Sequence, residues 1–172
     1  LSGLNMGSGV SSLTVGQGGT SGSTQNTGDV TLSTATSIAG PILVYGGDIT
    51  ASANLTSTLL DARIQLKSTG SINQSASGVA FRTNSGKIVL WSDADATNGG
   101  MVTLKGSLCT APTATTCDAN ATTGGDDIIV AGAAADSGDS TIPGGYASGT
   151  AIGAQTTTTG IQLGTMGTAN TG

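Results

Sequence analysis

Two similar stretches, GDVTL at residues 28–32 and GDITA at residues 47–51, decide the fold class of this chain of 172 residues. Each begins with Gly and Asp, which are turn residues, and then places an apolar side chain at every second position. Alternation with period two is typical of a half-buried β-strand, because successive side chains of a strand point to opposite faces of the sheet. Both stretches are therefore predicted to be a turn followed by a short strand.

The same pattern recurs along most of the chain. Its central Val and Ile positions are residues 30, 42, 49, 64, 72, 88, 102, 128 and 161. In the first half of the chain, alternate members lie 19 to 24 residues apart, as from Val30 to Ile49 and from Ile64 to Ile88. Two or three short strands in each unit of about 20 residues are typical of a β-solenoid, in which successive coils stack on one another.

We therefore expect residues 1–172 to form a single all-β segment, a parallel β-helix with almost no helix, cut from a longer repetitive protein. The inward side chains should form ladders through a narrow core, which accounts for an aromatic content of only 2%. A β-sandwich, with about seven evenly spaced strands and more aromatic residues, is the alternative. In the β-helix, the following side chains should be buried: Val30, Ile42, Ile49, Ile64, Ile72, Ile88, Val102 and Ile128.

Two stretches break the recurrence and are expected to protrude as loops, at about residues 106–123 and 132–159. The first contains Cys109 and Cys117, which are the two ends of a nine-residue segment with turn residues and Pro112. Two cysteines this close can form a small-loop disulfide, and we predict that bond, which requires an oxidising compartment. Two separate thiols are the alternative, and the spacing matches no zinc or redox motif.

The composition excludes several classes of protein. The chain contains no His, which argues against a Ser-His-Asp triad and against His-ligated zinc. A net charge of -5 with only five Lys and Arg residues argues against nucleic-acid binding. The longest apolar run is only a few residues, so no transmembrane helix is expected.

Longer stretches of the chain resemble a known family. TSIAGPILVYGGDI at residues 36–49, GKIVLWSDAD at residues 86–95 and the stretch 124–146 resemble coils of giant bacterial β-strand-repeat exoproteins, the adhesins related to filamentous haemagglutinin. The resemblance covers most of residues 10–165. It implies a right-handed parallel β-helix in a long, secreted or surface-attached fibrous protein.

Some parallel β-helices are carbohydrate-active enzymes, which use clustered Asp residues on one face of the coils. Asp in a turn rich in Gly and Ser usually caps backbone N–H groups, so no catalytic residue is predicted here. Oxygen ligands suited to calcium are present at Asp126, Asp127 and residues 136–140. No calcium-binding motif accompanies them. We therefore predict neither a metal nor a cofactor. The residues considered for catalysis are the pairs Asp93 and Asp95, Asp126 and Asp127, Asp136 and Asp139, with Arg63, Lys67, Arg82 and Lys87 as cations.

Aromatic and threonine residues suggest two further alternatives. Trp91 and Phe81 are expected on the inside of coil corners, and an exposed ring that stacks on a sugar is the alternative for each. Threonine runs at residues 113–116 and 156–159 suggest an ice-binding solenoid. Because no Thr is seen to recur at one fixed position per coil, ordinary solvent-facing strand Thr is expected instead.

We therefore expect an extracellular, non-catalytic, adhesive β-solenoid of a bacterial surface fibre, with a carbohydrate-active enzyme or an ice-binding solenoid as the alternatives. Self-association end to end is the expected partnership, and glycans of host or neighbouring cells are further possible partners. The strands around Leu13–Val15 and Ile161–Leu163 should lie at opposite ends of the rod and meet neighbouring subunits.

Overall fold

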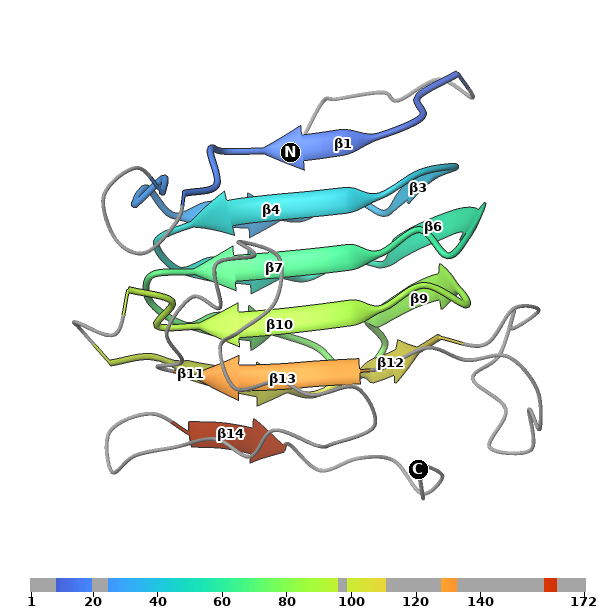
Figure 1. Ribbon diagram of the computed structural model, residues 1–172. Helices are drawn as coiled ribbons and strands as arrows, with labels where there is room; N and C mark the ends of the chain where they lie inside the picture. The colour runs from blue at the N-terminus through green and yellow to red at the C-terminus, as the bar shows by residue number, and fades with distance from the viewer. Residues whose placement is uncertain (1–8, 20–24, 96–98, 111–127, 133–159, 164–172) are drawn as a thin grey trace.

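The computed structural model describes residues 9–19, 25–95, 99–110, 128–132 and 160–163 (Figure 1). These residues form short β-strands that are joined by turns, and no helix occurs among them. Every strand pair is parallel, and the paired strands belong to successive coils. The predicted parallel β-helix is therefore confirmed, and the β-sandwich is excluded.

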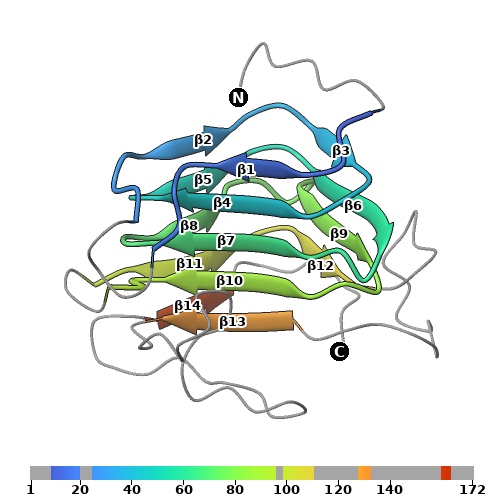
Figure 2. The same ribbon diagram turned by 45° about the horizontal axis from the view of Figure 1, so that its top comes forward.

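The strands lie in three sheets, which form three sides of each coil (Figure 2). Sheet A contains, in spatial order, β1 (Leu13–Val15), β4 (Ile42–Gly46), β7 (Ile64–Ser68), β10 (Ile88–Ser92) and β13 (Ile128–Gly132). Sheet B contains β2 (Val30–Leu32), β5 (Ile49–Ala51), β8 (Ile72–Gln74), β11 (Met101–Leu104) and β14 (Gly160–Leu163). Sheet C contains β3 (Thr36–Ile38), β6 (Leu55–Leu60), β9 (Ala80–Asn84) and β12 (Ser107–Cys109).

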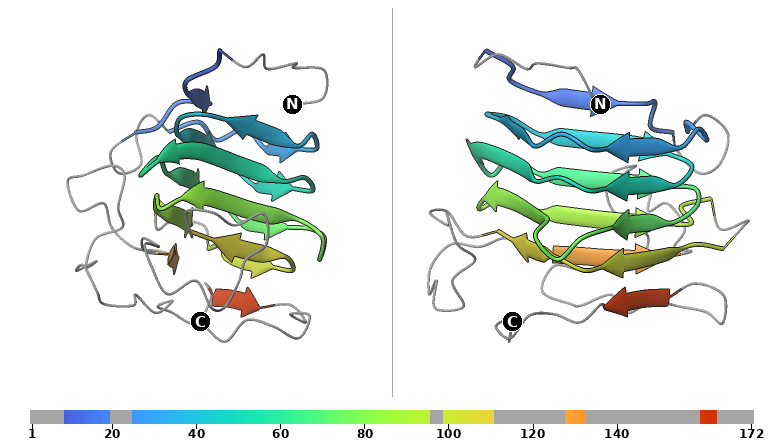
Figure 3. Two further views of the ribbon diagram at one scale, coloured as in Figure 1. Left: turned by 90° about the vertical axis from the view of Figure 1, so that its right-hand side faces the viewer. Right: turned by 180° about the vertical axis from the view of Figure 1, so that it is seen from behind.

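The chain visits the sheets in the order A, B and C and then begins the next coil. From β4 in front, it crosses to β5 behind and returns through β6 to β7, one level further down (Figures 1 and 3). Seen from the N-terminal end, this path is clockwise and moves away from the viewer, so the β-helix is right-handed. β1 lies at the N-terminal end of the stack and β14 at the opposite end (Figure 1).

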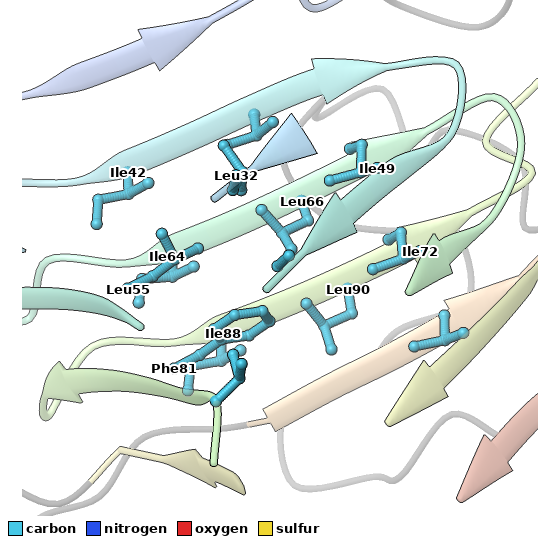
Figure 4. Close-up of a cluster of buried hydrophobic side chains, with 14 of the residues drawn as sticks. Leu32, Ile42, Ile49, Leu55, Ile64, Leu66, Ile72, Phe81, Ile88 and Leu90 are labelled. Atoms are coloured by element: carbon cyan, nitrogen blue, oxygen red, sulfur yellow. The ribbon is translucent and has the colours of Figure 1, made fainter. Parts of the chain in front are cut away.

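The core is built from side chains that repeat at the same place in each coil (Figure 4). In sheet A, Ile42 pairs with Ile64, and Ile64 pairs with Ile88. In sheet B, Ile72 stands between Ile49 and Val102. These six side chains are fully buried, as predicted. Such ladders fill the space between the sheets with aliphatic groups of nearly equal size, so one coil fits closely on the next.

Two of the eight residues predicted to be buried differ from expectation. Val30 is only partly buried, and Ile128 is 44% exposed. Among the described strands, β2 pairs with β5 alone and β13 pairs with β10 alone. A coil on one side only therefore covers these two side chains, whereas their counterparts inside the stack are covered on both sides.

The loop predicted from about residue 106 begins later than expected. Residues 107–109 form β12, which pairs with β9 and continues sheet C. A Cβ at Gly106 would overlap the backbone oxygen of Val79, so glycine allows the close approach at the start of this strand. The remainder of the predicted loop at residues 111–123, and residues 133–159 of the second predicted loop, lie outside the described residues.

The corner between sheets C and A also repeats from coil to coil. Asp61 and Ser85 follow the paired residues Leu60 and Asn84, and both have a positive φ, at 61° and 62°. A Cβ at Gly86 would overlap the backbone of Ala62 in the coil above, which shows how tightly successive corners stack. The sequence therefore constrains the stack at its corners as well as in its core.

Candidate binding surface

The outer face of sheet B carries polar side chains in register. Thr31 pairs with Thr50, Thr50 pairs with Asn73, and Asn73 pairs with Thr103. Each of the four lies between two inward apolar or buried neighbours, so its own side chain points away from the core. We call Thr31, Thr50, Asn73 and Thr103 the threonine column.

A second row stands beside the threonine column at the corner between sheets A and B. Asp29 Oδ1 accepts a hydrogen bond from the backbone N–H of Asp48 at 2.9 Å, and Asp48 Oδ1 accepts one from Ser71 N–H at 2.7 Å. Ser71 Oγ continues the series by accepting from Met101 N–H at 3.3 Å. Each side chain therefore caps a backbone donor of the next coil. This is the turn-capping role that the sequence predicts for Asp.

A third row follows directly after the strands of sheet B. It consists of Ser33, Ser52, Ser75 and Lys105. Ser75 Oγ donates to the backbone oxygen of Ala51 at 3.3 Å, and Ser52 Oγ stands 3.5 Å from that of Leu32. Together with the threonine column and the capping row of Asp29, Asp48 and Ser71, this row makes up what we call the polar face of sheet B.

The threonine column differs from the two flanking rows in its hydrogen bonding. Within the described part of the chain, the side chains of Thr50, Asn73 and Thr103 form no hydrogen bond, whereas Thr31 does interact with another residue. All of them belong to regular strands, so their backbones are fixed. The column therefore presents hydroxyl and amide groups, each able to donate and accept, to whatever lies in front of sheet B.

This column corrects an expectation drawn from the sequence. Thr31, Thr50 and Thr103 do recur at one position of the coil, although no fixed position for Thr is expected from the sequence. The signal was present, because each Thr directly follows a central Val or Ile. It was hidden by unequal coil lengths, since 19 residues separate Thr31 from Thr50, whereas 30 separate Asn73 from Thr103.

The outer face of sheet A is covered and apolar in part. Lys67 is 1% exposed, and its Nζ lies 4.3 Å from the centroid of the Trp91 ring. The same Nζ donates to the backbone oxygen of Gly19 at 2.9 Å. Gln25 Nε2 donates to the Lys67 backbone oxygen at 3.0 Å, so chain segments on both sides of residues 20–24 are tied to this face.

Tyr45 lies beside Lys67 in the neighbouring strand of sheet A. A Cβ at Gly18 would approach the Tyr45 ring to 2.6 Å, so the Gly18 backbone lies directly against the ring. Burial raises the pKa of the Tyr45 hydroxyl above its usual 10.0, and the positive charge of Arg63 partly opposes this rise. The Tyr45 and Lys67 side chains are therefore enclosed rather than presented to a ligand.

The two aromatic residues weighed for sugar stacking lie in different places. Phe81 is fully buried in the core, as expected. Trp91 is also fully buried, but it packs with Val89 and Ile129 on the outer side of sheet A and not inside a coil corner. Among the described residues, its Nε1 has no hydrogen-bond partner. Neither ring is available as an exposed sugar platform.

The carboxylates considered for catalysis do not form a cluster in the described part of the chain. Asp93 is 3% exposed and has a positive φ of 48°, and its backbone N–H donates to Gly70 at 2.9 Å. No group of three or more Cys and Asp residues suited to a metal occurs among the described residues. Asp126, Asp127, Asp136 and Asp139 lie outside these residues, as do the threonine runs at 113–116 and 156–159.

The disulfide between Cys109 and Cys117 stays a prediction, because only Cys109 lies among the described residues. Cys109 is buried at the end of β12. It pairs with Arg82 in sheet C, so it belongs to the coil stack rather than to a protruding loop. Cys117 lies outside the described residues. The position expected for Cys109, in a loop outside the coil stack, is wrong, because this cysteine continues a strand ladder.

The described residues contain no helix long and apolar enough to cross a membrane. Comparison of the chain with models of protein families, with curated proteins and with solved structures gives no match.

Proposed function

We propose that this chain is an extracellular, non-catalytic, adhesive β-solenoid that belongs to a bacterial surface fibre. One observation carries the proposal, namely that coils of one design are stacked in register along a single axis. A solenoid gains length by the addition of coils, because each coil contacts only its neighbours. Such a fold is suited to a long, narrow structure that extends from a surface.

Two further observations support a fibre. At one end of the described stack, β1, β2 and β3 each pair with a strand on one side only. A strand edge that is open in this way is a template for another strand. The stretches 36–49 and 86–95, which resemble coils of secreted adhesins, form stacked strands, and this supports an extracellular location.

Substitution of Thr14 by Pro tests growth at the β1 edge. Leu13 N–H donates to the backbone oxygen of Pro41, directly before β4, at 3.0 Å, so the N–H of the next residue, Thr14, points away from β4. Thr14→Pro removes this outward donor and leaves the bonds to β4 in place. We expect the unaltered chain to form end-to-end assemblies in sedimentation velocity and electron microscopy, and we expect Thr14→Pro to reduce them.

Thr14→Val is the matched control, because it keeps the backbone N–H and the β-branched shape. We expect it to assemble like the unaltered chain. Circular dichroism must show the same β-sheet content in all three proteins. If the folded, unaltered chain remains a monomer at every concentration, end-to-end association is wrong. If the chain turns over a polysaccharide, the carbohydrate-active enzyme replaces the adhesin.

A further inference from the structure

We propose that the polar face of sheet B is the adhesive surface of the rod and that it binds an extended, neutral polysaccharide lying along the coil axis. This inference rests on the proposed adhesive function and names the class of its partner. The threonine column, with Thr50, Asn73 and Thr103 available for hydrogen bonding, would form the centre of the binding surface.

The geometry of the column favours a repeating ligand. Its members recur once per coil, and neighbouring strands of a sheet are about 4.8 Å apart, so four strands extend about 14 Å along the axis. A polysaccharide in an extended conformation also presents hydroxyl groups at regular intervals along its length. Each coil can therefore offer the same polar contacts to successive parts of one polymer.

The hydrogen-bonding chemistry of the column matches that of a sugar. A Thr hydroxyl both donates and accepts, and the Asn amide supplies donors and an acceptor. Sugar hydroxyl groups have the same dual character. Because Thr50 and Thr103 are β-branched and belong to strands, their rotamers are already restricted, and little side-chain entropy is lost on binding.

The charges on the polar face select a neutral polymer. Asp29 and Asp48 are exposed along one side of the threonine column, and Lys105 is exposed on the other. Two carboxylates and one ammonium group, on a chain of net charge -5, disfavour a polyanion. The same charged groups disfavour ice, because strongly hydrated ions interrupt the ordered water that a flat hydroxyl surface would share with a crystal.

Affinity on this face has to come from repetition. Among the described residues, no aromatic side chain lies on the polar face, since Tyr45 and Trp91 are enclosed on sheet A and Phe81 is in the core. Single hydrogen bonds that replace bonds to water contribute little each. Their sum grows when one polymer contacts several coils at once. We therefore expect binding to polymers and insoluble glycans but not to short oligosaccharides.

Replacement of the two unbonded threonines tests the surface. Thr50→Val with Thr103→Val removes two hydroxyl groups from the column and keeps side-chain shape and β-branching. Depletion of the protein from solution by insoluble cellulose and by chitin measures binding. We expect the unaltered chain to bind at least one of them, and the double variant to bind it about tenfold more weakly, as loss of two hydrogen bonds predicts.

The matched control is Thr14→Val with Thr56→Val, on the outer faces of sheets A and C. Neither threonine makes a side-chain hydrogen bond within the described residues. We expect this control to bind like the unaltered chain. If the control variant loses as much glycan binding as the Thr50 and Thr103 variant, the proposal is wrong. It is also wrong if the unaltered chain binds neither cellulose nor chitin.

Two further measurements separate the possible failures. If the unaltered chain produces thermal hysteresis that the Thr50 and Thr103 variant lacks, and binds no glycan, the face binds ice and the proposed partner is wrong. The second measurement is electron microscopy of the same proteins. If the chain forms fibres but binds no glycan, only this inference is wrong. If it binds a glycan but forms no fibres, the proposed end-to-end assembly is wrong, and the polar face is supported as a glycan-binding surface.

Discussion

At the scale of single residues, the most unusual feature is Lys67, a nearly fully buried cation on the outside of the coil. An unpaired buried charge would be strongly destabilising. Here the ammonium group lies over the Trp91 ring and donates to the Gly19 oxygen, 48 residues away in the sequence. Lys67 therefore joins the N-terminal part of the chain to the middle of sheet A.

Substitution of Lys67 tests this role. Lys67→Met keeps the apolar stem but removes the hydrogen bond to Gly19 and the attraction to the Trp91 ring. We expect the free energy of unfolding to fall by about 2 kcal/mol, because the buried Gly19 carbonyl loses its donor. Urea denaturation followed by fluorescence of Trp91, the single Trp of the chain, provides the measurement.

Lys105→Met is the control for this prediction. Lys105 is exposed beside sheet B, so its replacement should change the free energy of unfolding by less than about 0.5 kcal/mol. An equal effect of the two substitutions would show that the loss of positive charge, and not the contacts of Lys67, determines the change.

At the scale of elements, the strands depend on close contact between successive corners. Gly86 lies where the corner between sheets C and A meets the coil above, and a Cβ there would overlap the Ala62 backbone. Gly86→Ala should therefore push two coils apart. We expect it to lower the free energy of unfolding by about 2 to 3 kcal/mol, the range for overpacking at a rigid site, as measured by urea denaturation.

Gly78 provides the matched position for this test. A Cβ at Gly78 would meet no atom within 4 Å. Gly78→Ala should leave stability unchanged or raise it by about 0.5 kcal/mol, because alanine restricts the unfolded chain. If both alanine variants are equally stable, the corner contact at Gly86 does not constrain the stack.

The elements also show which parts of the structure the sequence predicts. Stretches such as GDVTL and GDITA contain the turn, the strand and its inward face, so the ladder through Ile49 and Ile72 is predictable from local pattern. The packing on the outer faces of the sheets cannot be predicted from local pattern, because it depends on contacts between distant segments, such as that between Lys67 and Gly19. The threonine column is hard to recognise in the sequence for a different reason, since coils of unequal length conceal the register of its members.

At the scale of the whole molecule, the stack should tolerate the removal of one complete coil. Ile64 and Ile88 pair directly and occupy equivalent places, so deletion of residues 64–87 brings β10 against β4 in the same register. We expect the shortened protein to remain folded with the same type of β-sheet spectrum and a lower melting temperature, because nearest-neighbour coil contacts supply most of the stability. Circular dichroism during heating measures both properties.

A deletion that removes only part of a coil is the control. Loss of residues 64–75 removes β7 and β8 but keeps β9, so the chain would pass from sheet C to sheet C without a path through sheets A and B. We expect this protein not to fold. Survival of both deletions, or failure of both, would contradict a modular stack of coils.

The direction of the hydrogen bonds in this stack has a mechanical consequence. The bonds between strands run along the rod, while the chain itself is wound across it. Tension on the two ends of such a rod opens the bonds of one coil at a time instead of shearing a whole sheet. The coil from Ile64 to Lys87 occupies about 4.8 Å of the rod but extends to about 80 Å once unwound. A filament of these coils would lengthen in small steps under flow and would limit the force that reaches its attachment.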